Sequence, residues 1–305
     1  MTDANSSLPG SLAVLEDRVA DPSRSVRALL LMAPLVAFEL AIFVIPFGIL
    51  LRISLAEGSD DTVYAEGTWS LEAYADMVTN DVLWSVVGYS FKLGVVVTVV
   101  TVALALFYAY AIWRSSGLIE TILLFSVVLP LLTTLVIRTY AFRPLLAPTG
   151  TLNEVLLSLN LIAEPIHVLP GFVAVVVGQT YIVLPYAVLS IYSVLATMDW
   201  HVVEAARDLG ASRPRSVIEV VVPQAMPGIV VAAVISFAWS VGAYAAPGIL
   251  SNAIAFSGRV EDLMIGNFEY PTAAALSVVM LALMAGSIVL IVVLLDRFGG
   301  EFDLA

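Results

Sequence analysis

The chain has 305 residues, of which 60% are hydrophobic and 12% are charged, and it contains no cysteine. A soluble domain of this length could not bury so much apolar surface, so the sequence predicts an all-α membrane protein. The absence of cysteine excludes disulfides, thiolate metal sites and a cysteine nucleophile. The net charge of −12 disfavours nucleic acid as a partner.

Six apolar runs are each long enough to cross a hydrocarbon core of about 30 Å at about 1.5 Å per residue. They cover residues 28–53, 86–113, 119–142, 170–196, 227–250 and 272–295. The first run is too long for the core of a signal peptide, so we expect it to remain in the chain. The predicted domains are therefore an N-terminal tail over 1–27, a six-span domain over 28–297 and a C-terminal tail over 298–305.

The distribution of charge predicts the orientation of these spans. With the N-terminus inside the cell, the cytoplasmic segments hold eight of the thirteen basic residues. The first outside loop, residues 56–83, then contains seven acidic residues and no Lys or Arg. The opposite orientation would place the most basic segments outside. We therefore expect a multi-pass protein of the cell membrane with both termini in the cytoplasm.

A polar segment, residues 199–223, separates the fourth apolar run from the fifth. Asp199 can cap the N-terminus of a short helix, because its carboxylate can accept hydrogen bonds from the first free backbone N–H groups. Ala205 and Ala206 make the middle of this helix thin. Gly210 stands where a residue in the left-handed conformation would end the helix.

A second short helix is predicted after the first, with Ser212 as its cap and Pro223 near its end. Two short helices at a sharp angle, with small residues on the first, suit insertion into a groove on another protein. The sequence contains no GxxxxGK[ST], HExxH or GxSxG motif, so it predicts no catalytic residues, no metal site and no cofactor. A membrane protein without its own energy-coupling chemistry is expected to take its energy from a partner.

The 199–223 segment resembles the EAA loop of type I ABC importer permeases. That loop reads EAA, three residues, Gly, nine residues and then I-x-L-P. Here EAA stands at 204–206, the Gly at 210 and Val-Val-Val-Pro at 220–223, so the spacing fits while Val replaces Ile and Leu. The resemblance implies a coupling-helix loop in the cytoplasm between helices four and five, and a type I core over about 86–295.

The residues that this resemblance places in the ATPase-coupling loop are Asp199, Glu204, Ala205, Ala206, Gly210, Ser212 and Pro223. Glu204 would make polar contacts at the ATPase groove, and the small residues would permit close approach. The alternative is a solvated helix that Glu204 merely keeps soluble. Three arginines, at 207, 213 and 215, fit either contact with the ATPase or the positive-inside bias.

A second resemblance, to the spermidine/putrescine permease group, lies in the third apolar run. Residues 129–130 (Leu-Pro) and 138–142 (Arg-Thr-Tyr-Ala-Phe) look like the LP and RTYAW motifs of that group, with Phe142 in the place of Trp. Residues 69–74 (Trp-Ser-Leu-Glu-Ala-Tyr) fit its W-x-L-E-x-Y lead-in to the second span. This similarity implies polyamine import and covers nearly the whole chain beyond residue 28.

The family implies several partners. A cytoplasmic ABC ATPase dimer would bind the 199–223 segment, and ATP-driven closure would swing paired permeases from inward to outward facing. A second homologous permease would complete a heterodimer within the membrane lipid, and an extracytoplasmic binding protein would deliver the substrate. The chain itself would be a transport subunit without an ATPase site, and not an enzyme.

Two alternatives to polyamine import remain at this point. Related permeases carry other solutes, such as iron complexes, thiamine, phosphonates or opines. An ion-coupled secondary transporter belongs to a different class, which would need clustered acidic residues in the membrane and no docking loop. The chain has one acidic residue near the middle of a span, Glu39, and an EAA-like loop.

Charged and aromatic residues within the apolar runs are candidates for the translocation pathway, because intramembrane charge is costly and cations bind aromatic rings. Glu39 would attract a cation or pair with a polar group on a neighbouring span. Near the outer end of the third run, Arg138 is expected to pair with an acid. The other candidates, which are equally consistent with an interfacial aromatic belt, are Tyr140, Gln179, Tyr186, Trp239 and Tyr244.

Overall fold

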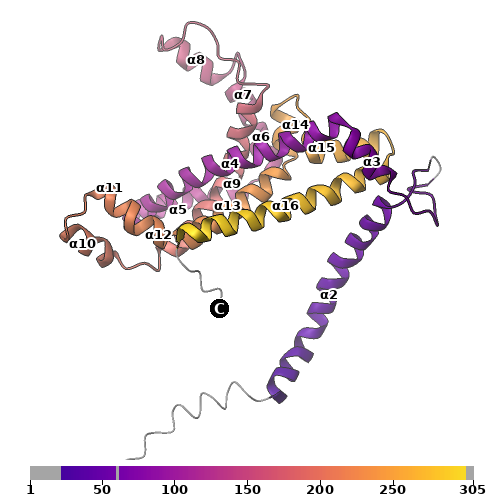
Figure 1. Cartoon of the computed structure of the whole chain (residues 1–305). Coiled ribbons are helices and arrows are strands. Elements are labelled where there is room, and N and C mark those ends of the chain that lie inside the picture. Colours follow the sequence, from indigo (N-terminus) through magenta and orange to yellow (C-terminus); the bar gives the residue numbers. More distant parts are fainter. Residues whose placement is uncertain (1–21, 60–61, 300–305) are drawn as a thin grey trace, which may run out of the picture. The chain divides into compact units, whose positions relative to one another are not determined.

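The computed structural model describes residues 22–59 and 62–299, and every regular element within these ranges is a helix (Figure 1). The predicted all-α architecture is therefore confirmed for this part of the chain. The chain divides into two units, Met1–Arg52 and Ile53–Ala305. Residues 1–21 of the expected N-terminal tail and 300–305 of the expected C-terminal tail lie outside the described residues.

The first unit is formed by α2, a helix that runs from Pro22 to Ser54 and ends just inside the second unit. It contains the whole of the first predicted span. Its stretch Leu31–Ser54 is long and apolar enough to cross a membrane. The helix continues through Pro34 and Pro46, although each lacks the N–H group that a helix interior normally uses.

The second unit is built around three long helices that pack against one another. They are α4 (Asp81–Arg114), α9 (Phe172–Leu195) and α13 (Met226–Val241). A fourth long helix, α16 (Tyr270–Gly299), packs against α13 and against the short α3 (Glu72–Thr79). Helix α3 contains residues 72–74 of the segment that leads into the second predicted span.

Glycines let these helices approach closely, as is common between membrane helices. A Cβ atom on Gly228 of α13 would lie 2.7 Å from the Ser190 carbonyl oxygen and 2.8 Å from the Ile191 Cα of α9. At this point the two helices touch backbone to backbone. On α4, a Cβ atom at Gly94 would lie 2.6 Å from the Val241 side chain.

The third apolar run, in which a span over 119–142 is expected, is not one continuous helix. Helix α5 (Leu118–Val128) passes into the 3-10 turn η1 (Leu129–Leu132), and the chain then bends by 108° into α6 (Leu135–Tyr140). Pro130 lacks an N–H for the helical ladder, and the two residues after η1, Thr133 and Thr134, are extended.

Two short helices follow this bend, α7 (Phe142–Leu146) and α8 (Thr151–Ser158). The second lies in the segment between the third and fourth predicted spans. Figure 1 shows α7 and α8 extending out from the helix bundle, whereas α10 and α11 lie at one end of the bundle. A buried Asn153 in α8 donates to the Ala147 carbonyl and exchanges two hydrogen bonds with the backbone of Ile166, so it fixes the following loop.

The 199–223 segment forms α10 (Trp200–Asp208) and a second helical stretch in three parts. The parts are α11 (Arg213–Ser216), the π-helical turn η2 (Val217–Val221) and α12 (Val222–Gln224). The chain then bends by 71° into α13. Beyond α13 come α14 (Ala245–Leu250), α15 (Phe256–Glu261) and a second π-helical turn, η3 (Asp262–Gly266).

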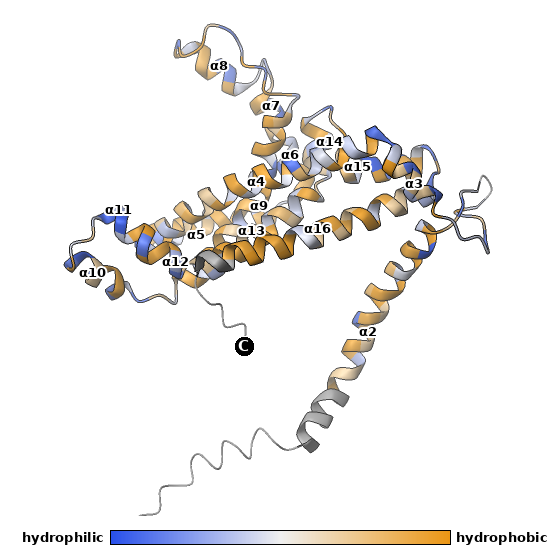
Figure 2. Cartoon of the chain, in the orientation of Figure 1, coloured by the Kyte–Doolittle hydropathy of each residue, from blue (hydrophilic) through white to orange (hydrophobic). Residues whose placement is uncertain are grey.

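Among the described residues, four helices are individually long and apolar enough to span a membrane, and there are up to six spans if each bent pair counts as one. Three of the four lie in the second unit, as α4, α9 and α16. Figure 2 shows hydrophobic residues along the length of α16 and hydrophilic ones gathered at α10 and α11. This pattern is that of an apolar bundle with polar loops at its ends.

Candidate functional site

Helix α10 begins and ends as its sequence predicts. The Asp199 carboxylate accepts a hydrogen bond from the His201 backbone N–H at 2.9 Å, which caps the N-terminus. At the other end Gly210 has a φ of +95°, in the left-handed region that favours glycine. The Gly210 N–H donates to the Arg207 carbonyl and the Ala211 N–H to the Ala206 carbonyl, which is a Schellman motif.

The second helical stretch begins differently from the prediction. Ser212 precedes α11 with an extended backbone, but its hydroxyl accepts no capping hydrogen bond. Pro214 occupies one of the first two positions of the helix, so one of the N–H groups that a cap would bind is missing. Pro223 lies near the end of the stretch, in α12, shortly before the 71° bend.

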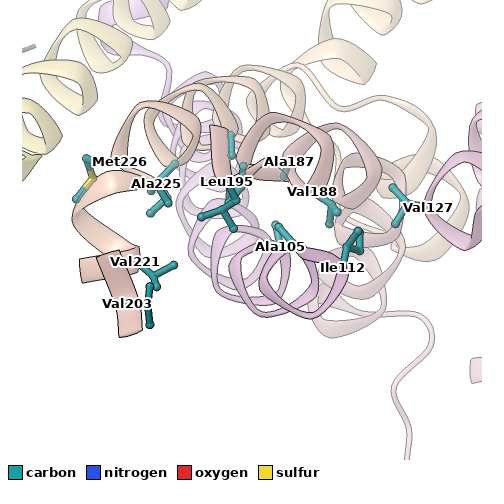
Figure 3. Close-up of a cluster of buried hydrophobic side chains, with 14 residues drawn as sticks. Ala105, Ile112, Val127, Ala187, Val188, Leu195, Val203, Val221, Ala225 and Met226 are labelled. Carbon is teal, nitrogen blue, oxygen red and sulfur yellow. The ribbon is translucent and has the colours of Figure 1, made fainter. Parts of the chain in front are cut away.

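Trp200 anchors α10 to the end of α4. Its ring meets the Trp113 ring edge-on, with the ring centroids 5.1 Å apart, and the Arg114 guanidinium lies over its face at 3.8 Å. One turn further along α10, Val203 is only 1% exposed and belongs to the same apolar cluster as Ile112 and Val221. Figure 3 shows Val203 and Val221 next to each other at one end of this cluster.

Glu204 lies on the exposed surface of α10 and is held by neighbours in its own helix. Its carboxylate accepts a hydrogen bond from the Trp200 Nε1 at 2.8 Å and lies 3.1 Å from the His201 Nδ1. Ala205 is exposed beside it and Ala206 is half-buried. The exposed surface of α10 therefore includes the short side chain of Ala205 and a carboxylate that its own helix holds in position.

Three of the six pathway candidates come together between α9 and α13. Tyr186 and Trp239 stack with their ring centroids 4.8 Å apart and their planes 30° apart. Gln179, which is 2% exposed, donates from its side-chain nitrogen to the Trp239 carbonyl at 3.3 Å. Trp239 is itself exposed, so this cluster presents an aromatic surface next to a buried amide.

The other three candidates lie elsewhere. Tyr140 is exposed on α6, after the 108° bend, and Tyr244 is exposed in the break between α13 and α14. Glu39 lies in α2, in the first unit. Within the second unit, the structure therefore brings together three of the five candidates that lie there.

Two interactions were missed by the sequence analysis. The packing of Trp200 against Trp113 and Arg114 joins residues from distant parts of the chain. The adjacent Trp113 and Arg114 at the end of a predicted span were a signal in the sequence that could have indicated such a contact. Arg138 pairs with no acid among the described residues. It donates from Nε and one terminal nitrogen to the Thr133 carbonyl, at 3.2 and 2.9 Å, and so caps the broken helix.

Comparisons with known proteins agree with this geometry. The model of a family described as binding-protein-dependent transport system inner membrane component matches residues 98–299. The spermidine/putrescine transport system permease protein PotB of Salmonella typhimurium (strain SL1344) is 30% identical over 234 residues, which cover 74% of this chain and 79% of the relative. PotB of Escherichia coli (strain K12) is 28% identical over 234 residues, with 74% and 82% covered.

A solved structure is also similar. It is the crystal structure of a bacterial ABC transporter involved in the import of the acidic polysaccharide alginate. The alignment covers 91% of this chain and 99% of that chain, with a TM-score of 0.73 and 13% sequence identity. At this identity the likeness shows that the two chains share a fold.

Proposed function

The chain belongs to the family of binding-protein-dependent transport system inner membrane components, and on that premise we propose that energy reaches it through the 199–223 segment. It acts as the transmembrane permease subunit of an ATP-driven ABC importer, with six spans and both termini in the cytoplasm. An ABC ATPase dimer binds the segment, so the permease needs no ATPase site of its own.

The observation that carries this proposal is the construction of α10. One face is fixed to α4 through Trp200 and Val203, while Ala205 is exposed on the other side of the helix. Glu204 is exposed beside Trp200 and accepts a hydrogen bond from its indole N–H. The Schellman motif at Gly210 then turns the chain sharply into α11. A rigidly mounted helix suits a groove on a partner, because the helix and its Glu204 carboxylate are already held in place, so little conformational entropy is lost on docking.

The proposed partners complete the transport cycle. A second homologous permease pairs with this one in the membrane, and an extracytoplasmic binding protein delivers the solute to the outer loops. The alginate transporter has been crystallised in complex with a pentasaccharide-bound periplasmic protein, which is an assembly of this kind for that protein. We extend the same arrangement to this chain.

Spermidine and putrescine are the proposed solutes. The identity to PotB over 74% of the chain supports this choice. The exposed Trp239, which stacks on the half-buried Tyr186, also supports it, because ammonium groups are attracted to the faces of aromatic rings. The fold alone does not select a solute, since the similar alginate transporter is involved in the import of an acidic polysaccharide.

Replacing Gly210 tests the coupling role. Gly210→Ala forces a side chain into the left-handed conformation, at a cost of about 1–2 kcal/mol. We expect this to lower solute-stimulated ATP hydrolysis by the reconstituted complex about tenfold. Gly67→Ala is a matched control, because Gly67 has a φ of +80° and, like Gly210, open space where a Cβ would lie. Equal losses in the two variants would contradict a special role for Gly210.

Uptake into proteoliposomes tests the solute. We expect complexes that contain the cognate binding protein to accumulate labelled spermidine or putrescine when ATP is supplied inside. A binding protein that takes up a different solute, with normal ATP-driven import of that solute, would refute the polyamine assignment and leave the permease role intact.

A further inference from the structure

A cavity of about 220 Å³ lies between the end of α4 and the 199–223 segment. Since one water occupies roughly 30 Å³ of liquid, this space is large enough for a tetrahedral anion with a few waters. One arginine from each of three helices lines it: Arg114 of α4, Arg207 of α10 and Arg213 of α11. Tyr110, Trp200, Val203 and Ser216 complete the lining, which includes no acidic residue.

None of these three arginines has an ion-pair partner among the described residues. The nearby carboxylates are already engaged. Glu204 is bound by Trp200 and His201, and Glu219 accepts a charge-assisted hydrogen bond from Arg215 at 2.8 Å. Three positive charges around one small space repel one another, so the cavity favours an anion that would neutralise them.

The position of the cavity indicates the source of that anion. Arg114 ends a membrane-spanning helix whose last turns also carry Tyr110 and Trp113, the residue types of the membrane–water interface. The lining residues of α10, which include Trp200 and Arg207, lie on the side of that helix that faces α4. The cavity therefore lies at the end of a membrane-spanning helix, where phospholipid headgroups are expected, and Glu204, which we assign to the ATPase, is not part of its lining.

We propose that this cavity binds the phosphate group of an anionic phospholipid. Guanidinium groups bind phosphate oxygens in pairs of parallel hydrogen bonds, and three of them arranged on α4, α10 and α11 can share one phosphate. The lipid thereby joins the 199–223 segment to the membrane helix that supports it. This site goes beyond the proposed function, since it requires the membrane alone and no ATPase.

Lipid retention measures the site directly. The purified full-length chain is mixed with phosphatidylglycerol or phosphatidylcholine in detergent, and the bound lipid is counted by native mass spectrometry. We expect the wild-type chain to retain more phosphatidylglycerol than phosphatidylcholine. Each arginine near a lipid surface contributes about a factor of five in affinity, so Arg207→Gln with Arg213→Gln should weaken this binding by about tenfold to thirtyfold.

Arg215→Gln is the matched control. It removes the same charge from α11, but Arg215 is paired with Glu219 and does not line the cavity. We expect its phosphatidylglycerol affinity to stay within about twofold of the wild-type value. Arg207→Lys with Arg213→Lys should lie between the wild type and the double glutamine variant, because the point charges remain while the paired guanidinium hydrogen bonds are lost. A loss for R215Q as large as for the double glutamine variant would show generic attraction and overturn the proposal.

Added inorganic phosphate distinguishes a site for the phosphate group of a lipid from a site for free phosphate. Displacement of phosphatidylglycerol by added phosphate from the wild-type chain, and not by an equal ionic strength of chloride, supports a phosphate site. Phosphate binding without any preference for phosphatidylglycerol over phosphatidylcholine would overturn the assignment to lipid. Unchanged lipid retention in the double glutamine variant, with an unchanged circular dichroism spectrum, would overturn the site itself.

Discussion

The two ends of α4 are built in opposite ways. At its C-terminal end, Trp113 and Arg114 pack on Trp200 of α10, and three arginines enclose a cavity of about 220 Å³. At its N-terminal end an open groove runs between α3 and the start of α16, with volumes of about 650 and 450 Å³ in two adjoining parts. Its charged lining residues are all acidic: Glu72, Asp76, Asp81 and Glu269.

Under the proposed function, this difference separates two tasks along one helix. The basic end is held by buried apolar and aromatic contacts, so it can transmit force from a docked partner. The acidic end is open and hydrophilic, and its carboxylates repel one another. Changes at the basic end should therefore alter energy coupling, whereas changes at the acidic end should alter stability by small, salt-dependent amounts.

The largest effect is expected for Trp200→Ala. The substitution removes the edge contact with Trp113, the stacking with Arg114 and the hydrogen bond to Glu204, and such truncations cost about 3 kcal/mol. We expect solute-stimulated ATP hydrolysis to fall by more than about tenfold. Trp200→Phe keeps a ring under Arg114 and should retain most of the activity.

A tryptophan at the acidic end supplies the control for this experiment. The Trp84 Nε1 donates one hydrogen bond, to the Val78 carbonyl, and its ring is exposed. Trp84→Ala should leave the stimulation of ATP hydrolysis unchanged. If Trp200→Ala were stimulated normally, the rigid mounting of α10 would have no part in coupling.

Removal of the helix cap near either end of α4, the cap of α10 at the basic end or that of α4 itself at the acidic end, should have an intermediate effect. Asp199 caps α10 through the His201 N–H, and Asn80 caps α4 through the N–H groups of Val82 and Leu83. Each change to Ala should cost about 1 kcal/mol. For Asp199→Ala we expect solute-stimulated ATP hydrolysis to fall about fivefold, with little change in the melting temperature.

For Asn80→Ala the outcome should be reversed. Because α4 is central to the fold, its cap contributes to global stability, so the melting temperature should fall. The solute-stimulated rate of ATP hydrolysis per folded complex should stay normal. Thermal unfolding and stimulated ATP hydrolysis, measured on the same preparations, separate the two outcomes. If the two variants changed the melting temperature and the stimulated ATP hydrolysis to the same extent, the two ends of α4 would not have different tasks.

The smallest effect is expected for Asp76→Asn. Asp76 follows Glu72 by four residues on α3, and like charges at this spacing destabilise a helix by about 0.2–0.5 kcal/mol. The variant should be slightly more stable at low salt, and the gain should disappear at high salt. Asp81→Asn should act in the opposite direction, because Asp81 lies in the first turn of α4, where a negative charge is favourable. Denaturant titrations at two salt concentrations measure both.

Local signals in the sequence predicted the local structure. Asp199 and Gly210 fix the ends of α10 through their own backbone and side-chain preferences, and both were identified correctly. The break after η1 was not predicted, because Pro130 signals only a weak point. At the 108° turn, Arg138 reaches back to the Thr133 carbonyl, a contact that no local pattern in the sequence signals.

Contacts between distant residues were beyond sequence reasoning. The hydrogen bond from Gln179 to the Trp239 carbonyl joins residues 60 positions apart, and the placement of both on facing helices follows only from the packed bundle. The stacking of Trp200 on the end of α4 has the same origin. The pathway roles of the aromatic residues and of Glu39 stay predictions, because they depend on partners that the chain alone does not specify.

The π-helical turn η2 has a consequence for how this segment can change in evolution. Its wide turn, closed by the Val222 N–H on the Val217 carbonyl, places one extra residue between α11 and α12. Adding or removing a residue there would rotate α10 by about 100° about the axis of the second stretch. The exposed face of α10 would then point elsewhere, so insertions and deletions between Gly210 and Pro223 should be tolerated far less than substitutions.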